Sequence, residues 1–92
     1  MAKQFSISEF NENQEQYSEY TSHVLTLEEA TLVQTATGAL FNNNGVNPAM
    51  CVGKTIEDVV ELFEEDEEEY GGEIIADFIV TLFPNDFSDW DY

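Results

Sequence analysis

The most distinctive chemical feature of the sequence is a block of carboxylates between Glu57 and Glu69. Nine of these thirteen positions are Glu or Asp, and none is Lys or Arg. A run of this kind can bind cations or a basic protein surface, or it can simply keep a protein soluble. Helix surfaces usually mix Glu with Lys at four-residue spacing, so a block without any base favours a binding role. The residues that we expect to contact a partner are Glu57, Asp58, Glu61, Glu64, Glu65, Asp66, Glu67, Glu68 and Glu69.

The rest of the chain is acidic as well. Twenty Asp and Glu stand against Lys3 and Lys54, which gives a net charge of −18 at pH 7. Residues 57–92 carry fourteen of the acids and no base. Such a chain repels nucleic acid and anionic membranes, so we expect it to bind neither directly and to find its partners among basic surfaces. The sequence leaves open whether the chain also forms a homodimer.

The residue types that ordinarily carry catalysis are scarce. His23 is the one histidine and Cys51 the one cysteine, and nothing in their spacing brings a nucleophile to a base. A zinc site needs three or four protein ligands, mostly nitrogen and sulfur, which these two residues cannot supply. The glutamate run also lacks the alternating ligands of an EF-hand calcium loop. We therefore expect no enzymatic activity, no cofactor and no metal site.

The chain shows no signal for export or membrane insertion. Its start, MAKQFSISEF, lacks an apolar run. The longest strongly apolar segment, residues 74–83, is too short to span a bilayer. A single cysteine permits no internal disulfide, which suits a reducing compartment. These features predict a cytoplasmic protein.

Four segments show helical periodicity, and three of them begin with a capping pattern. Ser6 and Thr26 each precede a glutamate by three residues, the spacing of a capping box, and Thr55 precedes a third apolar stripe. The Asn- and Gly-rich stretch 42–54 is expected to be a loop. The predicted helices cover residues 7–22, 27–41, 56–70 and 73–83.

The third helix has to position the acids. Its apolar residues follow the i, i+3, i+4, i+7 pattern of one buried face and are Ile56, Val59, Val60 and Phe63. The acids then occupy the opposite face, and Gly71 and Gly72 are expected to end the helix. The fourth helix has a broad apolar face that includes Phe78, and we expect it to be the centre of the core.

These elements predict a mainly α-helical single domain over residues 1–84, a small bundle of about four helices. The second helix is weakened by three threonines and by Gly38, and the apolar fourth segment also suits a buried strand. The alternative is therefore an α+β fold with a short sheet formed by residues 27–41, by residues 73–83, or by both.

Residues 85–92 form an acidic and aromatic C-terminal tail. Aromatic residues three apart, separated by aspartates, suit docking into an apolar groove with a basic rim. They equally suit packing back onto the domain, where they would close its core. The tail is a secondary partner-binding candidate, through Asp86, Phe87, Asp89, Trp90 and Asp91.

The spacing of the acids invites a comparison with nucleic acid. On one helix, residues 57–69 would place about one charge per 2 Å of axis, against about one per 1.7 Å in duplex DNA. In size, charge and layout the chain resembles the small acidic DNA-mimic inhibitors, many of them phage proteins of the anti-restriction or anti-CRISPR type.

That resemblance implies a non-enzymatic inhibitor acting in the cytoplasm of a host cell. It would bind the basic nucleic-acid channel of a DNA-binding protein, such as a CRISPR effector or a restriction enzyme, and block DNA access. The alternative is a small acidic adaptor or transcription regulator that docks through the Phe and Trp of its C-terminal tail.

Overall fold

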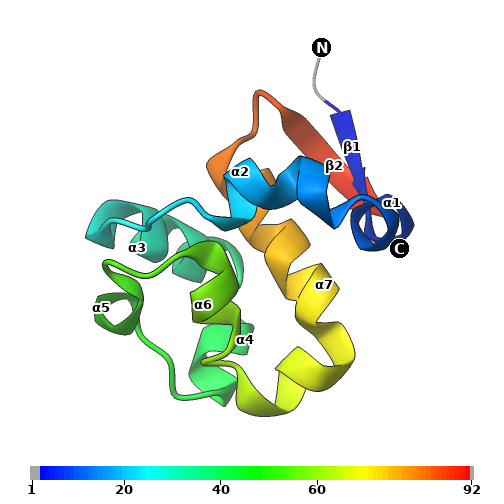
Figure 1. Ribbon diagram of the computed structural model, residues 1–92. Coiled ribbons are helices and arrows are strands. Elements are labelled where there is room, and N and C mark those ends of the chain that lie inside the picture. Colours follow the sequence, from blue (N-terminus) through cyan, green and yellow to red (C-terminus); the bar gives the residue numbers. More distant parts are fainter. Residues whose placement is uncertain (1–2, 92) are drawn as a thin grey trace.

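The elements that this sequence forms are mainly helical (Figure 1). A computed structural model describes the backbone of residues 3–91 and the side chains of residues 4–87. The prediction of a small, mainly helical domain is confirmed. Its elements are β1 (Lys3–Ser6), α1 (Ile7–Glu12), the 3-10 helix η1 (Gln14–Tyr17), α2 (Ser18–Thr21), α3 (Leu27–Ala36), α4 (Gly38–Asn43), α5 (Pro48–Cys51), α6 (Ile56–Val60), α7 (Glu64–Leu82) and β2 (Phe87–Asp91).

The alternative fold, with a sheet at residues 27–41 or 73–83, is wrong. These segments lie in α3, α4 and α7. The threonines that seemed to favour a strand are accommodated in the helix through their hydroxyls. Thr31, Thr35 and Thr37 each donate to the carbonyl four residues earlier, at 2.8, 3.0 and 2.8 Å.

The three predicted N-terminal caps are confirmed. The hydroxyls of Ser6 and Thr55 accept hydrogen bonds from backbone N–H groups three residues on, at 3.4 and 3.1 Å. Thr26 forms a complete capping box, because it accepts from the N–H of Glu29 while the Glu29 carboxylate accepts from the N–H of Thr26. Each of these hydrogen bonds joins groups three residues apart, so the caps can be recognised from the sequence.

The chain is divided more finely than predicted. Residues 7–22 hold α1, η1 and α2, with a break at Asn13 (φ −126°, ψ 43°). The predicted loop 42–54 contains the single turn α5. Asn47 caps this turn and Pro48 starts it, at a position where a missing N–H leaves no hydrogen bond unmade.

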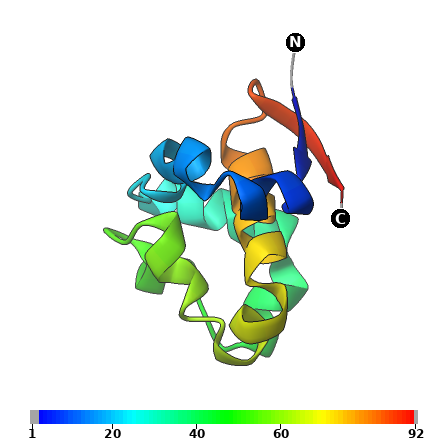
Figure 2. The same cartoon turned by 45° about the vertical axis from the view of Figure 1, so that its right-hand side comes forward.

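α7 separates two clusters of buried side chains, and Figures 1 and 2 show it running through the middle of the fold. Ile74 and Phe78 join the cluster built mainly by α3 to α6, whereas Ala76 and Ile79 join the cluster formed with β1, α1 and β2. One helix therefore supplies both halves of the core, as expected for the apolar fourth segment.

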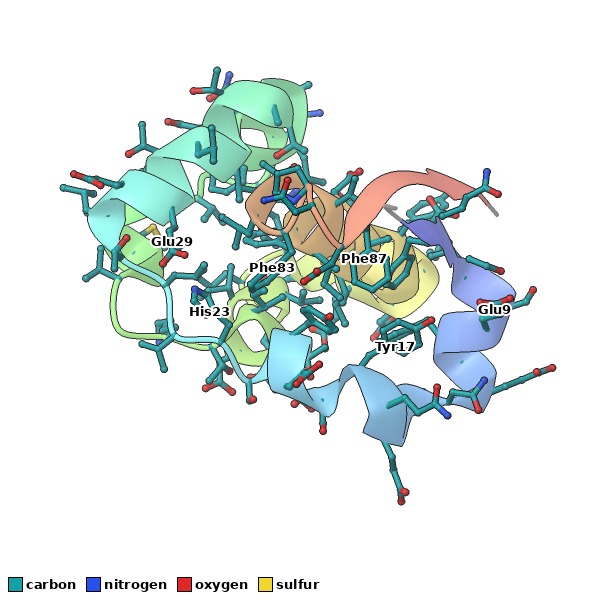
Figure 3. The ribbon with its side chains drawn as sticks, turned by 90° about the horizontal axis from the view of Figure 1, so that it is seen from above. Glu9, Tyr17, His23, Glu29, Phe83 and Phe87 are labelled. Atoms are coloured by element: carbon teal, nitrogen blue, oxygen red, sulfur yellow. The ribbon has the colours of Figure 1, made fainter. Side chains whose placement is uncertain are left out.

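The two strands bring the ends of the described chain together. β1 and β2 pair in parallel, a contact between distant segments that the sequence did not indicate. Phe5 and Phe87 are fully or almost fully buried, and their rings meet edge-on with centroids 5.6 Å apart. Tyr17 packs beside Phe87 (Figure 3). This aromatic cluster anchors the strand pair to α7.

His23 connects the segment before α3 to the end of α7. Its Nε2 donates to Glu29 Oε2 at 2.6 Å, and its ring meets Phe83 edge-on at 5.3 Å (Figure 3). Burial raises the pKa of Glu29, but hydrogen bonds from the His23 ring and the Thr26 backbone outweigh burial and hold that pKa below its ordinary value.

We expect Glu29→Gln to be less stable than the wild-type protein at neutral pH by about 1 kcal/mol, because the amide loses a charge-assisted bond. The carboxyl has a lower pKa in the folded than in the unfolded chain. Its contribution is therefore present above the unfolded pKa, about 4.3, and is lost as the pH falls through the folded-state pKa. Urea unfolding of both proteins should show the difference at about pH 7 and its decline as the pH is lowered below the unfolded pKa of the carboxyl. A difference that persists in acid would contradict this assignment.

Candidate acidic interface

The nine acids of the block lie on two helices and the turn between them. Glu57 and Asp58 lie in the first turn of α6, Glu61 is the C-cap of that helix, and the acids from Glu64 to Glu69 begin α7. The expectation of one continuous acidic helix is wrong. The acids form two segments joined by a turn, and not a single row along one helix.

The break between α6 and α7 keeps the apolar stripe buried. The N–H groups of residues 61–63 each donate to the carbonyl three residues earlier, at 2.9–3.2 Å. This tighter winding leaves Phe63 fully buried, with its ring 5.3 Å from that of Phe41 and 6.4 Å from that of Phe78. Phe63 thus fixes the starting point of α7 in the core.

The first turns of α7 project from this anchor. No side chain between Glu64 and Tyr70 is buried, and Tyr70 is 48% exposed. The helix boundary expected at Gly71 and Gly72 lies directly before them. The backbone leaves helical geometry at Tyr70 (φ −125°, ψ 17°), and this kink divides α7 into an acidic segment and a second segment that starts at the glycines and continues into the core. The acidic turns lie at the end of the molecule opposite the strand pair (Figures 1 and 2).

One hydrogen bond ties the acidic turns to the rest of the fold. Asp66 is half-buried, and its Oδ2 accepts from Asn44 Nδ2 at 2.9 Å. The same amide nitrogen donates to the carbonyl of Leu40, also at 2.9 Å. The end of α4 therefore holds the start of α7 in place.

The charge of the block is not neutralised by cationic side chains in the part of the chain that the structure describes. Among side chains 4–87 the contact of a basic side chain with a carboxylate is the hydrogen bond of His23 to Glu29, which lies outside the block, and Lys54 forms no ion pair. The four acids of the first turn of α7, Glu64 to Glu67, lie at the positive end of the helix dipole. The backbone offsets part of their repulsion, and the side chains of Glu64, Glu65 and Glu67 remain exposed.

The secondary candidate segment is partly built into the core. Phe87 is 2% exposed, so its side chain is not presented to a partner. Asp86 is exposed and accepts from the Tyr20 hydroxyl at 3.4 Å. β2 continues through Asp89, Trp90 and Asp91, whose side chains lie outside the described residues.

His23 and Cys51 have separate partners. The Cys51 thiol is buried and lies 3.8 Å from the carbonyl of Asn47, to which it donates. Burial raises the pKa of this thiol, and Lys54 opposes the shift only in part. Over the described residues, no three His, Cys, Asp or Glu side chains are grouped to hold a metal ion. No helix in that segment is both long and apolar enough to cross a membrane.

Sequence reasoning missed the groups that shape the surface beside the acids. A depression of about 370 Å³, called here the acidic groove, lies between the turn after α6 and the segment from α4 to α5. Its lining includes Asn44 and Met50, both from the stretch expected to be a plain loop. Asn44 and Asp66 are 22 residues apart, and no local pattern signals such a contact.

Comparisons with known proteins provide no further guide to this surface. No protein-family model, curated protein or solved structure matches the chain, so its resemblance to DNA mimics rests on charge, size and layout.

Proposed function

We propose that this protein is a non-enzymatic inhibitor that occupies the nucleic-acid channel of a DNA-binding protein. The observation that carries the proposal is the projecting start of α7, where six consecutive acids, Glu64 to Glu69, contribute no buried side chain and have no described cationic partner. Glu61 lines one depression together with Glu64 and Glu65 and so extends this acidic surface to the end of α6. Glu57 and Asp58 add two carboxylates in the first turn of α6. In a basic channel that normally binds DNA, these carboxylates would occupy the positions of the phosphates.

The way in which the block is held supports a binding role over solubility alone. Solubility requires only net charge, wherever it lies on the surface. Here the Phe63 anchor, the Asn44–Asp66 hydrogen bond and the bend at Tyr70 fix the position of the acidic turns. Fixed charges lose less conformational entropy on binding than flexible ones, which favours recognition.

An adaptor that docks through the C-terminal aromatic residues has less support. The burial of Phe87 commits one of its two principal aromatic side chains to the core. None of the acidic side chains at the start of α7 is buried in the core in this way.

The proposal predicts competition with DNA. The protein should be assayed against representatives of the proposed target classes, namely a CRISPR effector, a restriction endonuclease and a uracil-DNA glycosylase. For a target that it inhibits, increasing protein should displace a fluorescent DNA duplex, because both ligands use the same Lys and Arg side chains. A target that binds DNA and this protein simultaneously and independently would rule out mimicry.

A further inference from the structure

The acidic groove combines charge with an apolar surface. Glu61, Glu64 and Glu65 supply three exposed carboxylates from the end of α6 and the start of α7. Val46, Met50 and Leu62 supply the apolar part of the same lining. The groove therefore places carboxylates and an apolar surface side by side.

The apolar lining is graded from buried to exposed. Val46 is 4% exposed and belongs to the core, Leu62 is partly buried against it, and Met50 is 41% exposed. The unbranched thioether of an exposed methionine adapts readily to a partner's surface. Met50 is therefore the side chain best placed to gain from contact with an incoming group.

We propose that the acidic groove receives an arginine side chain of the partner. The aliphatic stem of arginine can lie on Met50 and Leu62 while its guanidinium reaches the carboxylates. Arginine suits the groove better than lysine because its planar group has five donors and is more weakly hydrated, so it can bridge several carboxylates beside an apolar surface. The inference rests on the proposed function for the kind of partner, and it adds how that partner is recognised.

A second depression provides an internal comparison. It has a volume of about 440 Å³ and lies between the N-terminal helices and α7. Its lining includes two carboxylates, Glu15 and Glu57, and its largest apolar side chain, Phe10, is buried. It lacks an exposed apolar side chain comparable with Met50, so arginine should prefer the acidic groove.

The test uses short peptides as probes and needs no identified target. The ¹⁵N-labelled protein is titrated with capped hexa-arginine and with capped hexa-lysine at low salt. Amide shifts should concentrate at Met50, Glu61, Leu62 and Glu64, and hexa-arginine should bind about fivefold more tightly than hexa-lysine. Equal affinities, or shifts spread evenly over the acidic residues of both depressions, would overturn the inference.

The Met50→Ala variant tests whether peptide binding depends on the apolar lining of the groove or on charge attraction alone. This variant keeps the net charge but loses much of the exposed apolar lining, so hexa-arginine should bind about fivefold more weakly and the preference over hexa-lysine should shrink. Leu32→Ala is the matched control, because Leu32 is 52% exposed on α3 and does not line the groove. Both variants should keep the amide spectrum of a folded protein. Unchanged affinity of Met50→Ala would overturn the inference.

The same variants distinguish this inference from the proposed function. If Met50→Ala displaces DNA from a target as well as the wild-type protein does, mimicry stands and the arginine groove is rejected. If hexa-arginine binds in the groove as described while no target shows competition with DNA, the groove stands and the proposed function is rejected.

Discussion

We expect the simultaneous replacement of Glu64, Glu65, Glu67 and Glu68 by glutamine to weaken binding to the DNA-binding target by about a hundredfold. We take about 0.7 kcal/mol for each lost contact between exposed charges. Four such losses amount to about 2.8 kcal/mol, which corresponds to a hundredfold change in Kd. The salt dependence of binding should flatten, because fewer ion contacts remain to be screened. Titration calorimetry at two salt concentrations measures both effects.

The fold should survive these substitutions. The four side chains are exposed and glutamine keeps their size and helix propensity. Relief of like-charge repulsion at i, i+3 and i, i+4 offsets the loss of favourable contact with the helix dipole, and each effect amounts to a few tenths of a kcal/mol. The melting temperature should therefore change little, so a loss of affinity reports on the interface.

The matched control removes the same charge elsewhere. Glu9, Glu12, Glu19 and Glu28 are exposed on α1, α2 and α3, and their replacement by glutamine leaves the same net charge as the first variant. Affinity should fall less than about threefold, because long-range attraction is screened over about 10 Å at moderate salt. Equal losses in the two variants would show that total charge, rather than the acidic turns of α7, determines binding.

The features that sequence analysis found correctly are local ones. The caps at Ser6, Thr26 and Thr55 depend on side chains three residues from the groups they satisfy. The apolar stripe from Ile56 to Phe63 is buried as predicted. Interactions over one turn of helix leave a pattern in the sequence that periodicity can detect.

The break within the acidic block left no such pattern. The i to i−3 hydrogen bonds after α6 keep Phe63 on the buried side, so the stripe looks the same with or without the break. The glycines indicated a helix boundary that is present one residue earlier. The backbone leaves helical geometry at Tyr70, directly before Gly71 and Gly72, whereas the packing of Ile74 and Phe78 beyond the glycines holds the second segment of α7 in the core.

The remaining unpredicted features depend on distant contacts. The β1–β2 pair joins segments from opposite ends of the described chain. The acidic groove requires α4, α5 and the turn after α6 to meet. The acids could be recognised in the sequence, whereas the surface that they share with Met50 depends on contacts between distant segments.

We expect Phe78→Ala to destabilise the protein by about 3–5 kcal/mol, the usual cost of removing a buried phenyl ring. Phe78 is fully buried, and its ring lies 6.3 Å from that of Phe41 and 6.4 Å from that of Phe63. A domain of this size has a total stability of about 5–14 kcal/mol. The cavity would therefore remove much of that stability, and urea unfolding followed by far-UV circular dichroism measures the loss.

The effect of Phe78→Ala should extend to the interface through Phe63. The three rings hold the start of α7 in the core, so a cavity beside Phe63 loosens the anchor of the acidic turns. Phe78→Leu fills most of that space and should cost about 1–1.5 kcal/mol while retaining binding, and Leu32→Ala at an exposed position should cost less than about 0.5 kcal/mol. Wild-type stability in Phe78→Ala would show that α7 does not organise the core. If Phe78→Leu is stable but no longer binds the target, Phe78 has a direct role at the interface that its burial does not predict.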